Sequence, residues 1–334
     1  NYKLSFDKKL NIFFGKNGCG KTNILEGISL NAKGRGIRNS SISNLIKKKE
    51  TNFKIQNTFE IQNNIFDIEI HSEKDEDKYK KIIKVNDDKS KDSIDILNNS
   101  LSYLIFLPEM ERLFQASPSY RRNFLDRLIF SGRNNYNRLI NKYKKFLLER
   151  SKILQNNSTD YDWLNQIERD ISLSGLEIYK LRHSHLNSIN SNLKLLKNDH
   201  NFQFNLDLKI KDEYFTNKLS YDQYLISLQN SRSYDKKFGG SKIGPHKSDI
   251  TAIINNEFEA LLLSTGQQKA IVLMILLAQC NILVNSKKIK PILLLDEIGS
   301  HLDTFNRQIL LDMINKFELQ FFLTGTDKDL FSFV

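Results

Sequence analysis

Apolar residues recur along this chain with two different spacings, which separates strand-rich stretches from helical ones. The apolar run Leu10–Phe14 predicts a buried strand, and Thr22–Ile28 predicts a helix that follows it after a glycine-rich turn. Residues 53–86 alternate between polar and apolar side chains, which predicts antiparallel hairpins with turns at Asn63–Asn64 and in the charged run Ser72–Lys78. The N-terminal part of the chain therefore favours mixed α/β structure.

The middle of the chain carries apolar residues at helical spacing. Ser117 followed by Pro118 fits a helix start, since serine caps N–H groups and proline suits the first helical position. Two apolar stripes follow, on either side of the polar break Gln155–Asp160. We interpret these stripes as the core of a helical domain, and the alternative is a face that binds a partner. A strand over Phe202–Ile210 and a helix over Tyr221–Leu228 complete this region.

The C-terminal part returns to alternating strands and helices. The predicted elements are strands Asp249–Ile254, Glu257–Leu263, Pro291–Leu295 and Gln320–Thr324 and helices Gln267–Val284 and Phe305–Phe317, in addition to an earlier strand over Leu101–Leu107. Glycines are absent from residues 37–131 and gather toward the two ends of the chain. We therefore expect one domain built from residues 1–112 and 236–334, with a helical domain, residues 113–235, inserted into it.

The glycine-rich turn after the first strand fits G-x-x-x-x-G-K-[ST], the phosphate-binding loop. Its residues are Gly15, Lys16, Asn17, Gly18, Cys19, Gly20, Lys21 and Thr22, with Asn23 next in the helix. Backbone N–H groups of such a loop, together with the helix N-terminus, bind phosphate. Lys21 is expected to reach the β- and γ-phosphates of ATP, and the Thr22 hydroxyl is expected to bind Mg²⁺. A chance glycine-rich turn is the alternative, and the flanking strand and helix argue against it.

Two carboxylates follow the predicted buried strand near the C-terminus. Asp296 is the expected second Mg²⁺ ligand, and Glu297 is expected to polarise the attacking water as a catalytic residue beside Lys21. Acidic residues often follow strands, so this pair gains its meaning from the upstream phosphate loop.

The segment Leu263–Lys269 resembles the L-S-G-G-Q signature of ABC-type ATPases. Its candidate residues are Ser264, Thr265, Gly266 and Gln267. The bland alternative is a simple helix cap by Ser264, and both roles are compatible. In that family the capped helix covers the γ-phosphate held by a second subunit, so the resemblance implies an ATP-dependent homodimer. It also implies that Ser300 and Asp303, in the loop after the catalytic glutamate, lie at the dimer seam.

Three further blocks make the chain similar to the RecF family, recombinational repair ATPases related to SMC heads. They are Gly18–Glu26, Phe106–Glu109 with Ser117–Asp126, and Gly244–Asp249, the last with Lys247 and Ser248 where the family usually has arginine and aspartate. The resemblance covers essentially the whole chain. It implies an ABC-type ATPase head, lobe I with an antiparallel β subdomain, and an inserted mainly helical lobe II.

The resemblance also implies a function in DNA repair and replication. An ATP-bound dimer would clamp double-stranded DNA near single-strand gaps and ss/dsDNA junctions, and slow, DNA-stimulated ATP hydrolysis would release it. RecR and the RecO pathway would be partners in recombinase loading after DNA damage and in the SOS response. A transporter-type ATPase is the main rival, but Leu323–Thr326 lacks the switch histidine of transporters. A small-molecule kinase and an ATP-binding scaffold without turnover are further alternatives.

Composition adds a polyanion partner and a reducing compartment. The net charge is +11, which favours nucleic acid, although a low-GC genome would also enrich lysine. The two cysteines, Cys19 and Cys280, cannot form a disulfide framework, and no apolar run seems long enough for a membrane span, so we expect a cytoplasmic protein without a membrane partner.

Several basic residues are candidates for DNA contact. Arg121 and Arg122 lie in the first turn of a predicted helix, where the helix dipole disfavours cations, so a carboxylate such as Asp126 or a DNA phosphate should compensate. Lys247 is a third candidate. The neighbouring His246 is expected to be a structural hydrogen-bonding residue rather than a catalytic base.

Overall fold

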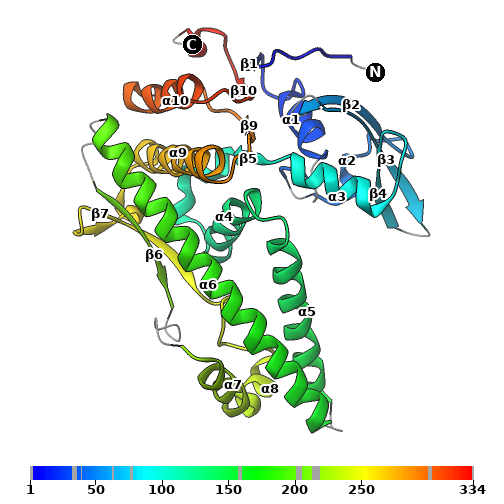
Figure 1. Cartoon of the computed structure of the whole chain (residues 1–334), viewed down its shortest axis with the longest axis vertical. Coiled ribbons are helices and arrows are strands. Elements are labelled where there is room, and N and C mark those ends of the chain that lie inside the picture. Colours follow the sequence, from blue (N-terminus) through cyan, green and yellow to red (C-terminus); the bar gives the residue numbers. More distant parts are fainter. Residues whose placement is uncertain are drawn as a thin grey trace. The chain divides into compact units, whose positions relative to one another are not determined.

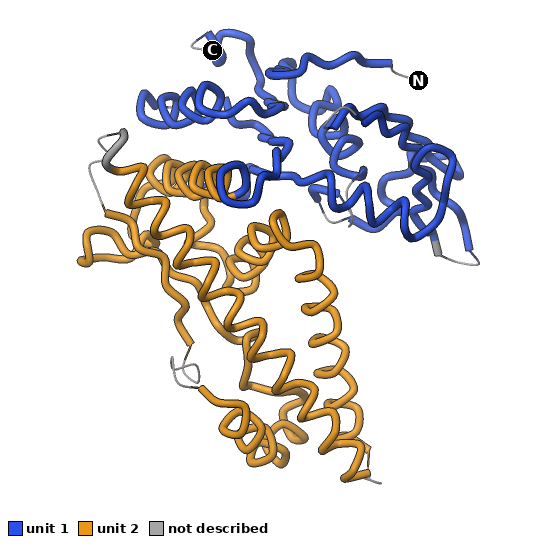
Figure 2. The backbone as a smooth tube through the Cα atoms, viewed as in Figure 1, with its two compact units in different colours: residues 1–111, 283–334 blue, residues 112–282 orange. Residues whose placement is uncertain are grey.

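A computed structural model describes residues 3–31, 36–38, 40–61, 64–75, 78–156, 160–200, 205–212, 219–299 and 303–332. The chain divides into two compact units (Figure 2), which are residues 1–111 with 283–334, and residues 112–282. The first division lies close to the predicted boundary at residue 112. Residues 236–282, expected in the ATPase domain, belong to the second unit by their contacts, and the predicted domain boundaries themselves remain a prediction.

Unit 1 is built on a parallel sheet in the order β1-β10-β9-β5. The strands are β1 (Leu10–Phe14), β5 (Tyr103–Phe106), β9 (Ile292–Leu295) and β10 (Phe321–Gly325). Strands β9 and β10 are buried along their whole length, which explains their continuous apolar sequences. Since all four strands run in the same direction, their carboxyl ends meet at one edge, with Phe14 paired to Gly325 and Leu295 to Phe106.

A second sheet in unit 1 is antiparallel, in the order β2-β3-β4. Its strands are β2 (Lys54–Ile61), β3 (Asn64–Asp75) and β4 (Lys78–Val85). The expected turn at Ser72 is wrong, because β3 continues to Asp75. Lys80 of β4 forms an ion pair with Asp75, so opposite charges across the strands accommodate the charged run within the sheet.

The helices of unit 1 are α1 (Lys21–Ser29), α2 (Ile42–Leu45), α3 (Lys91–Ser100) and α10 (Thr304–Lys316), with the short helical turns η1 (Pro108–Gln115), η3 (Ile282–Ser286) and η4 (Asp329–Phe331) at or near its boundaries. Helix α3 was not expected from the sequence. It is signalled by Ser90, whose side chain caps the N–H of Ser93.

Unit 2 is mainly helical. It contains α4 (Pro118–Ser131), α5 (Tyr136–Gln155), α6 (Tyr161–His200), α7 (Tyr221–Asn230), α8 (Arg232–Phe238) and α9 (Thr265–Asn281). Helices α5 and α6 pack side by side (Figure 1), and α6 also contacts α9. Ser117 caps α4 and Pro118 occupies its first turn, as predicted. The apolar stripes form the core of this unit.

A small antiparallel sheet completes unit 2 in the order β6-β7-β8, comprising β6 (Leu206–Lys211), β7 (Asp249–Ile254) and β8 (Phe258–Glu259). Asn255 and Asn256 form the expected turn with positive φ angles of 52° and 62°. The second predicted strand of this hairpin is shorter than expected, because the short helix η2 (Ala260–Leu262) replaces its end.

One helical segment, Thr265–Ser286, is long and apolar enough to cross a membrane by length and composition, contrary to the expectation that no run would be. Every residue from Gln268 to Cys280 is buried within the protein. A helix that is apolar on all sides is typical of a protein core as well as of a membrane span, and its burial assigns this one to the core.

Candidate functional site

The glycine-rich loop follows β1 and leads into α1, as the sequence predicts. Gly15, Gly18 and Gly20 have positive φ angles of 152°, 83° and 100°, which only glycine adopts readily. The Lys21 ammonium is 6% exposed and donates hydrogen bonds to the carbonyl oxygens of Gly15 at 2.6 Å and Lys16 at 3.3 Å. The loop thus curls around its lysine, the shape of a phosphate-binding loop.

The N-terminus of α1 lies at the end of this loop. Gly20 is its N-cap residue and offers no side chain to the first N–H groups of the helix. The N-terminal N–H groups of a helix and its dipole bind anions when no side chain caps them. The thiol-bearing Cys19 is exposed on the loop, while Asn23 in the first turn accepts a hydrogen bond from Arg38 at 3.2 Å.

The two carboxylates after β9 lie beside this loop. The Thr22 hydroxyl is 2.9 and 3.1 Å from the two carboxylate oxygens of Asp296, which is 4% exposed. The Lys21 Nζ atom lies 3.9 Å from Oε1 of Glu297. Residues separated by more than 270 positions in the sequence therefore meet in one cluster, because β1 and β9 both end at the same edge of the parallel sheet.

Thr324 on β10 connects the two carboxylate residues, a role that sequence reasoning missed. Its hydroxyl donates to Oδ1 of Asp296 at 2.6 Å and accepts from the backbone N–H of Glu297 at 2.7 Å. The side chain is fully buried. Glu297 itself has a positive φ of 50°, an uncommon conformation for a residue with a side chain. The available signal was the place of Thr324 at the end of a strand that pairs with β9.

The residues of this cluster fit Mg²⁺. A threonine hydroxyl and a carboxylate are the oxygen ligands that Mg²⁺ prefers, and the ion takes its other ligands from phosphates and water. In the part of the chain that the structure describes, no group of three or more histidine, cysteine, aspartate or glutamate residues could hold a metal ion by itself. Thr22 and Asp296 are the residues that could hold it here.

The predicted signature segment starts α9. The Ser264 hydroxyl accepts from the Gln267 N–H at 3.3 Å, and the Gln267 side chain accepts from the Ser264 N–H at 3.0 Å, which together form a capping box. Ser264, Thr265 and Gln267 are exposed and Gly266 is half-buried. The cap reading is therefore confirmed, and the segment is open to a ligand or partner. Of the two seam candidates, Asp303 caps α10 through Asn306 at 2.7 Å, and Ser300 lies outside the described residues.

The candidate DNA-contacting arginines have internal partners. Arg121 forms two hydrogen bonds of 2.7 Å with the Asp249 carboxylate, and Arg122 donates to the Ser248 carbonyl at 2.6 Å. Burial alone would raise the pKa of Asp249, but the hydrogen bonds and charge of Arg121 outweigh it and hold that pKa below its usual value.

The internal carboxylate proposed for these arginines was Asp126, and this detail is wrong. Asp126 instead pairs with Arg182 at 2.9 Å and accepts from Tyr136 at 2.6 Å. Lys247, the third candidate, is exposed. Sequence spacing favoured a partner one helical turn away, whereas the fold brings β7 alongside α4.

His246 is a structural residue. Its Nε2 atom lies 2.8 Å from the Ser241 carbonyl, which can only accept, so Nε2 carries the proton and Nδ1 accepts from the Tyr143 hydroxyl at 2.7 Å. Burial lowers the pKa of His246 to about 4, with the positive charges of Lys247, Arg122 and Arg182 acting in the same direction. The neutral ring is therefore the native form.

Comparison with known proteins agrees with this geometry. The family model described as RecF/RecN/SMC N terminal domain matches residues 1–334. The DNA replication and repair protein RecF of Rickettsia prowazekii (strain Madrid E) is 33% identical over 338 residues, covering 98% of this chain and 91% of that protein. The chain belongs to the RecF family. A RecF relative from Rickettsia typhi (strain ATCC VR-144 / Wilmington) is likewise 33% identical over 342 residues, with the same coverage.

Solved structures place this RecF-family chain among ABC-type ATPase heads. A structure of the recombination mediator protein RecF with ATP, in the RecFOR pathway, matches with a TM-score of 0.84 and 27% identity over 98% of this chain and 88% of that one. An Smc head bound to the C-winged helix domain of ScpA matches with a TM-score of 0.54 at 17% identity, a likeness of fold alone. The predicted fold class is confirmed.

Proposed function

We propose that this RecF-family chain is an ATP-dependent DNA-binding protein of DNA replication and recombinational repair. The observation that carries the proposal is the cluster of Lys21, Thr22, Asp296 and Glu297 at the carboxyl edge of the parallel sheet. An ATP-bound RecF of the same fold and the RecF names of its relatives support it.

Each residue of the cluster has a distinct part in the proposed chemistry. Lys21 holds the β- and γ-phosphates when its bonds to the loop carbonyls are exchanged for phosphate oxygens. Thr22 and Asp296 hold Mg²⁺, which supplies charge neutralisation between the phosphates. Glu297 accepts a proton from the attacking water. Thr324 fixes the backbone from which Glu297 extends.

The proposed active form is a dimer that encloses ATP. Ser264, Thr265 and Gln267 are exposed at the N-terminus of α9, whose dipole favours an anion such as the γ-phosphate held by a second copy. Binding energy of ATP would then close two copies on double-stranded DNA near single-strand gaps and ss/dsDNA junctions, and slow hydrolysis would reopen them. Asp303, and Ser300 near it, are proposed at the seam.

The proposed biological setting is recombinase loading with RecR and the RecO pathway in the cytoplasm. The net charge of +11 supports binding to DNA, and Arg121, Arg122 and Lys247 remain candidate contacts. Because Arg121 is 12% exposed and paired with Asp249, Lys247 is the most accessible of the three. A transporter ATPase remains a weaker alternative, since Thr324–Thr326 stands where transporters carry a switch histidine.

The substitution Glu297→Gln tests the proposal. It removes the proton acceptor but keeps the side-chain size, so we expect an ATP-bound dimer that no longer turns over and retains duplex DNA. Sedimentation with ATP, with ADP and without nucleotide, each with duplex, measures this. Lys21→Ala is the matched control, because it should prevent the ATP-bound dimer altogether. A monomer that ignores ATP in the Glu297→Gln variant would contradict the proposal.

A further inference from the structure

An exposed aromatic pair stands on the outer face of α8 in unit 2. The rings of Tyr234 and Phe238, one helical turn apart, lie 4.4 Å apart between centroids with an angle of 33°. Tyr234 is 41% exposed and Phe238 is 58% exposed. Large rings are rarely left in water at this level without a binding role, and a stacked pair presents a broad apolar surface.

Lysines surround these rings. The Lys242 Nζ atom lies 4.3 Å from the centroid of Tyr234 and 5.3 Å from that of Phe238, and the Lys237 Nζ atom lies 5.6 Å from that of Phe238. Lys236, Lys237, Lys242 and Lys247 are all exposed. We call Tyr234, Lys236, Lys237, Phe238 and Lys242 the α8 platform.

No exposed acidic side chain offsets this charge within residues 231–248. The only acidic residue of that segment is Asp235, which is 1% exposed and forms a 2.7 Å ion pair with Arg150 of α5. The carboxylate that could neutralise the platform is thus turned inward and already paired. The outward charge is positive, which complements a polyanion.

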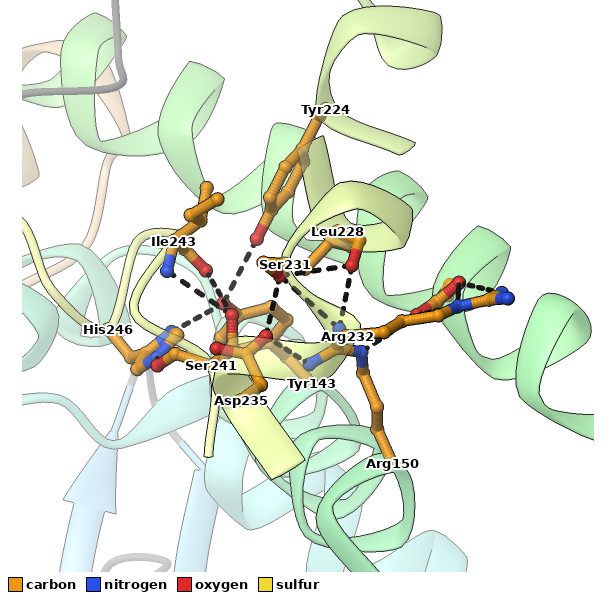
Figure 3. A network of polar contacts seen from close by, with 11 residues as sticks. Tyr143, Arg150, Tyr224, Leu228, Ser231, Arg232, Asp235, Ser241, Ile243 and His246 are labelled. Carbon is orange, nitrogen blue, oxygen red and sulfur yellow. Dashed lines mark hydrogen bonds and ion pairs between the residues drawn. The ribbon is translucent and has the colours of Figure 1, made fainter. Parts of the chain in front are cut away.

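The platform is held from beneath by a polar network (Figure 3). Arg150 donates to Asp235, to the Leu228 carbonyl and to Glu168, and Ser231 donates to Asp235 at 2.6 Å. Arg232 pairs with Glu168 at 2.5 Å. These bonds fix α8 against α5 and α6, so the outer rings are presented on a rigid element.

A second part of the network holds the segment that carries Lys242. The Ser241 hydroxyl donates to the Ile243 carbonyl at 3.0 Å, and His246 joins the Ser241 carbonyl to Tyr143 of α5. A rigid site loses little conformational entropy when a ligand binds, so pre-organisation of this kind favours a binding function over a merely local contact.

We propose that the α8 platform binds unpaired nucleotides, with bases stacked on Tyr234 and Phe238 and phosphates held by Lys236, Lys237 and Lys242. Exposed aromatic rings combined with cations are the chemistry that binds single-stranded nucleic acid, since every base offers a face to stack on. Bases inside a duplex already stack on one another and cannot use such rings. The inference rests on the proposed DNA-binding function and adds to it a separate site for single strands.

The test compares the full-length chain with the double variant Tyr234→Ala/Phe238→Ala. Fluorescence anisotropy measures binding to a labelled oligothymidylate, to an abasic phosphodiester of the same length, and to duplex with ATP. We expect the double variant to bind oligothymidylate about 5- to 100-fold more weakly, because stacking contributes that much per base, and to bind duplex as the wild type does.

The matched control is Trp163→Ala. Trp163 is 58% exposed, like Phe238, but it lies at the start of α6 next to Asp162. Its removal should leave oligothymidylate binding unchanged. The double variant Lys237→Gln/Lys242→Gln should lower the slope of log K against log salt by about 1.4 for the single strand, at about 0.7 for each phosphate contact.

Crosslinking gives a readout that does not depend on how the variants fold. An iodouracil-substituted oligonucleotide irradiated with the wild-type chain should attach to Tyr234 or Phe238, as identified by mass spectrometry. Oligothymidylate binding that is absent, that survives the aromatic double variant, or that is no tighter than abasic or polyglutamate binding would overturn the platform; the last result would assign it to acidic partners. Loss of ATP-dependent duplex binding in the wild type would instead overturn the proposed function.

Discussion

At the scale of single residues, the site depends on Thr324 as well as on the motif residues. Its hydroxyl contacts both Asp296 and the backbone of Glu297, so one side chain sets the distance between the Mg²⁺-binding carboxylate and the proposed base. A buried N–H that loses its acceptor costs about 1–3 kcal/mol, which the strained backbone of Glu297 would release by moving.

Thr324→Val should therefore slow ATP hydrolysis while leaving ATP affinity nearly unchanged. Valine keeps the shape of threonine and removes both hydrogen bonds, so we expect kcat to fall about 10- to 100-fold, since 1.36 kcal/mol corresponds to a factor of ten. Steady-state kinetics and equilibrium binding of ATP measure the two effects. Thr324→Ser restores the hydroxyl and should recover most of kcat. A valine variant with unchanged kcat would show that the hydroxyl does not position Glu297.

At the scale of elements, unit 2 is stabilised by polar contacts that join α5 to the segment after α8. The ring of His246 accepts a hydrogen bond from Tyr143 and donates to Ser241, and both contacts require the neutral ring in its present tautomer. Gly244 has a φ of 129°, and an added Cβ would collide with the hydroxyls of Tyr143 and Tyr224. The turn and the buried tyrosines are thus mutually dependent.

This contact predicts a pH dependence of stability. The folded pKa of His246 is about 4 against about 6.5 for an unfolded histidine, so the unfolded chain binds a proton between these values that the folded chain does not. Stability should therefore fall as pH falls, by about 2 kcal/mol between pH 7.5 and pH 5 from this residue. Urea unfolding of wild type and His246→Gln measures it, since glutamine does not titrate. Equal pH profiles for the two chains would refute the assignment.

At the scale of the whole molecule, the proposed ATP site needs two copies of the chain. Lys21 would hold the phosphates from one copy, and Ser264 would cover them from the other. Each copy of a symmetric dimer then contributes to both sites, so a defect in either part inactivates a homodimer.

Mixing two inactive variants tests this arrangement. Lys21→Ala should lack the phosphate grip, and Ser264→Arg should lack the covering serine. A heterodimer of the two carries one site in which both parts are intact, so the mixture should regain up to about a quarter of wild-type ATPase activity if copies exchange at random. Activity is measured as phosphate release with duplex DNA. If Ser264→Arg alone hydrolyses ATP as the wild type does, the site is complete within one copy.

Much of the fold was predictable because local patterns and tertiary packing agree. Strand β1 has the predicted bounds, and α1, α9 and α10 lie within a few residues of prediction, since each combines an apolar pattern with a recognisable start. Helices α3 and α8 were missed. Helix α8 is short, and the contact that holds it, Arg150 with Asp235, joins residues 85 positions apart, which no local pattern reveals.

The sequence by itself determined the phosphate loop, its magnesium ligands and the capped signature helix, because each depends on residue types at fixed short spacing. Only the tertiary structure decided that Thr324 joins Asp296 to Glu297, that Asp249 rather than Asp126 pairs with Arg121, and that Tyr234 and Phe238 face outward among lysines. Such contacts arise from strand order and helix packing. They depend on distances between residues far apart in the chain, which composition and periodicity do not encode.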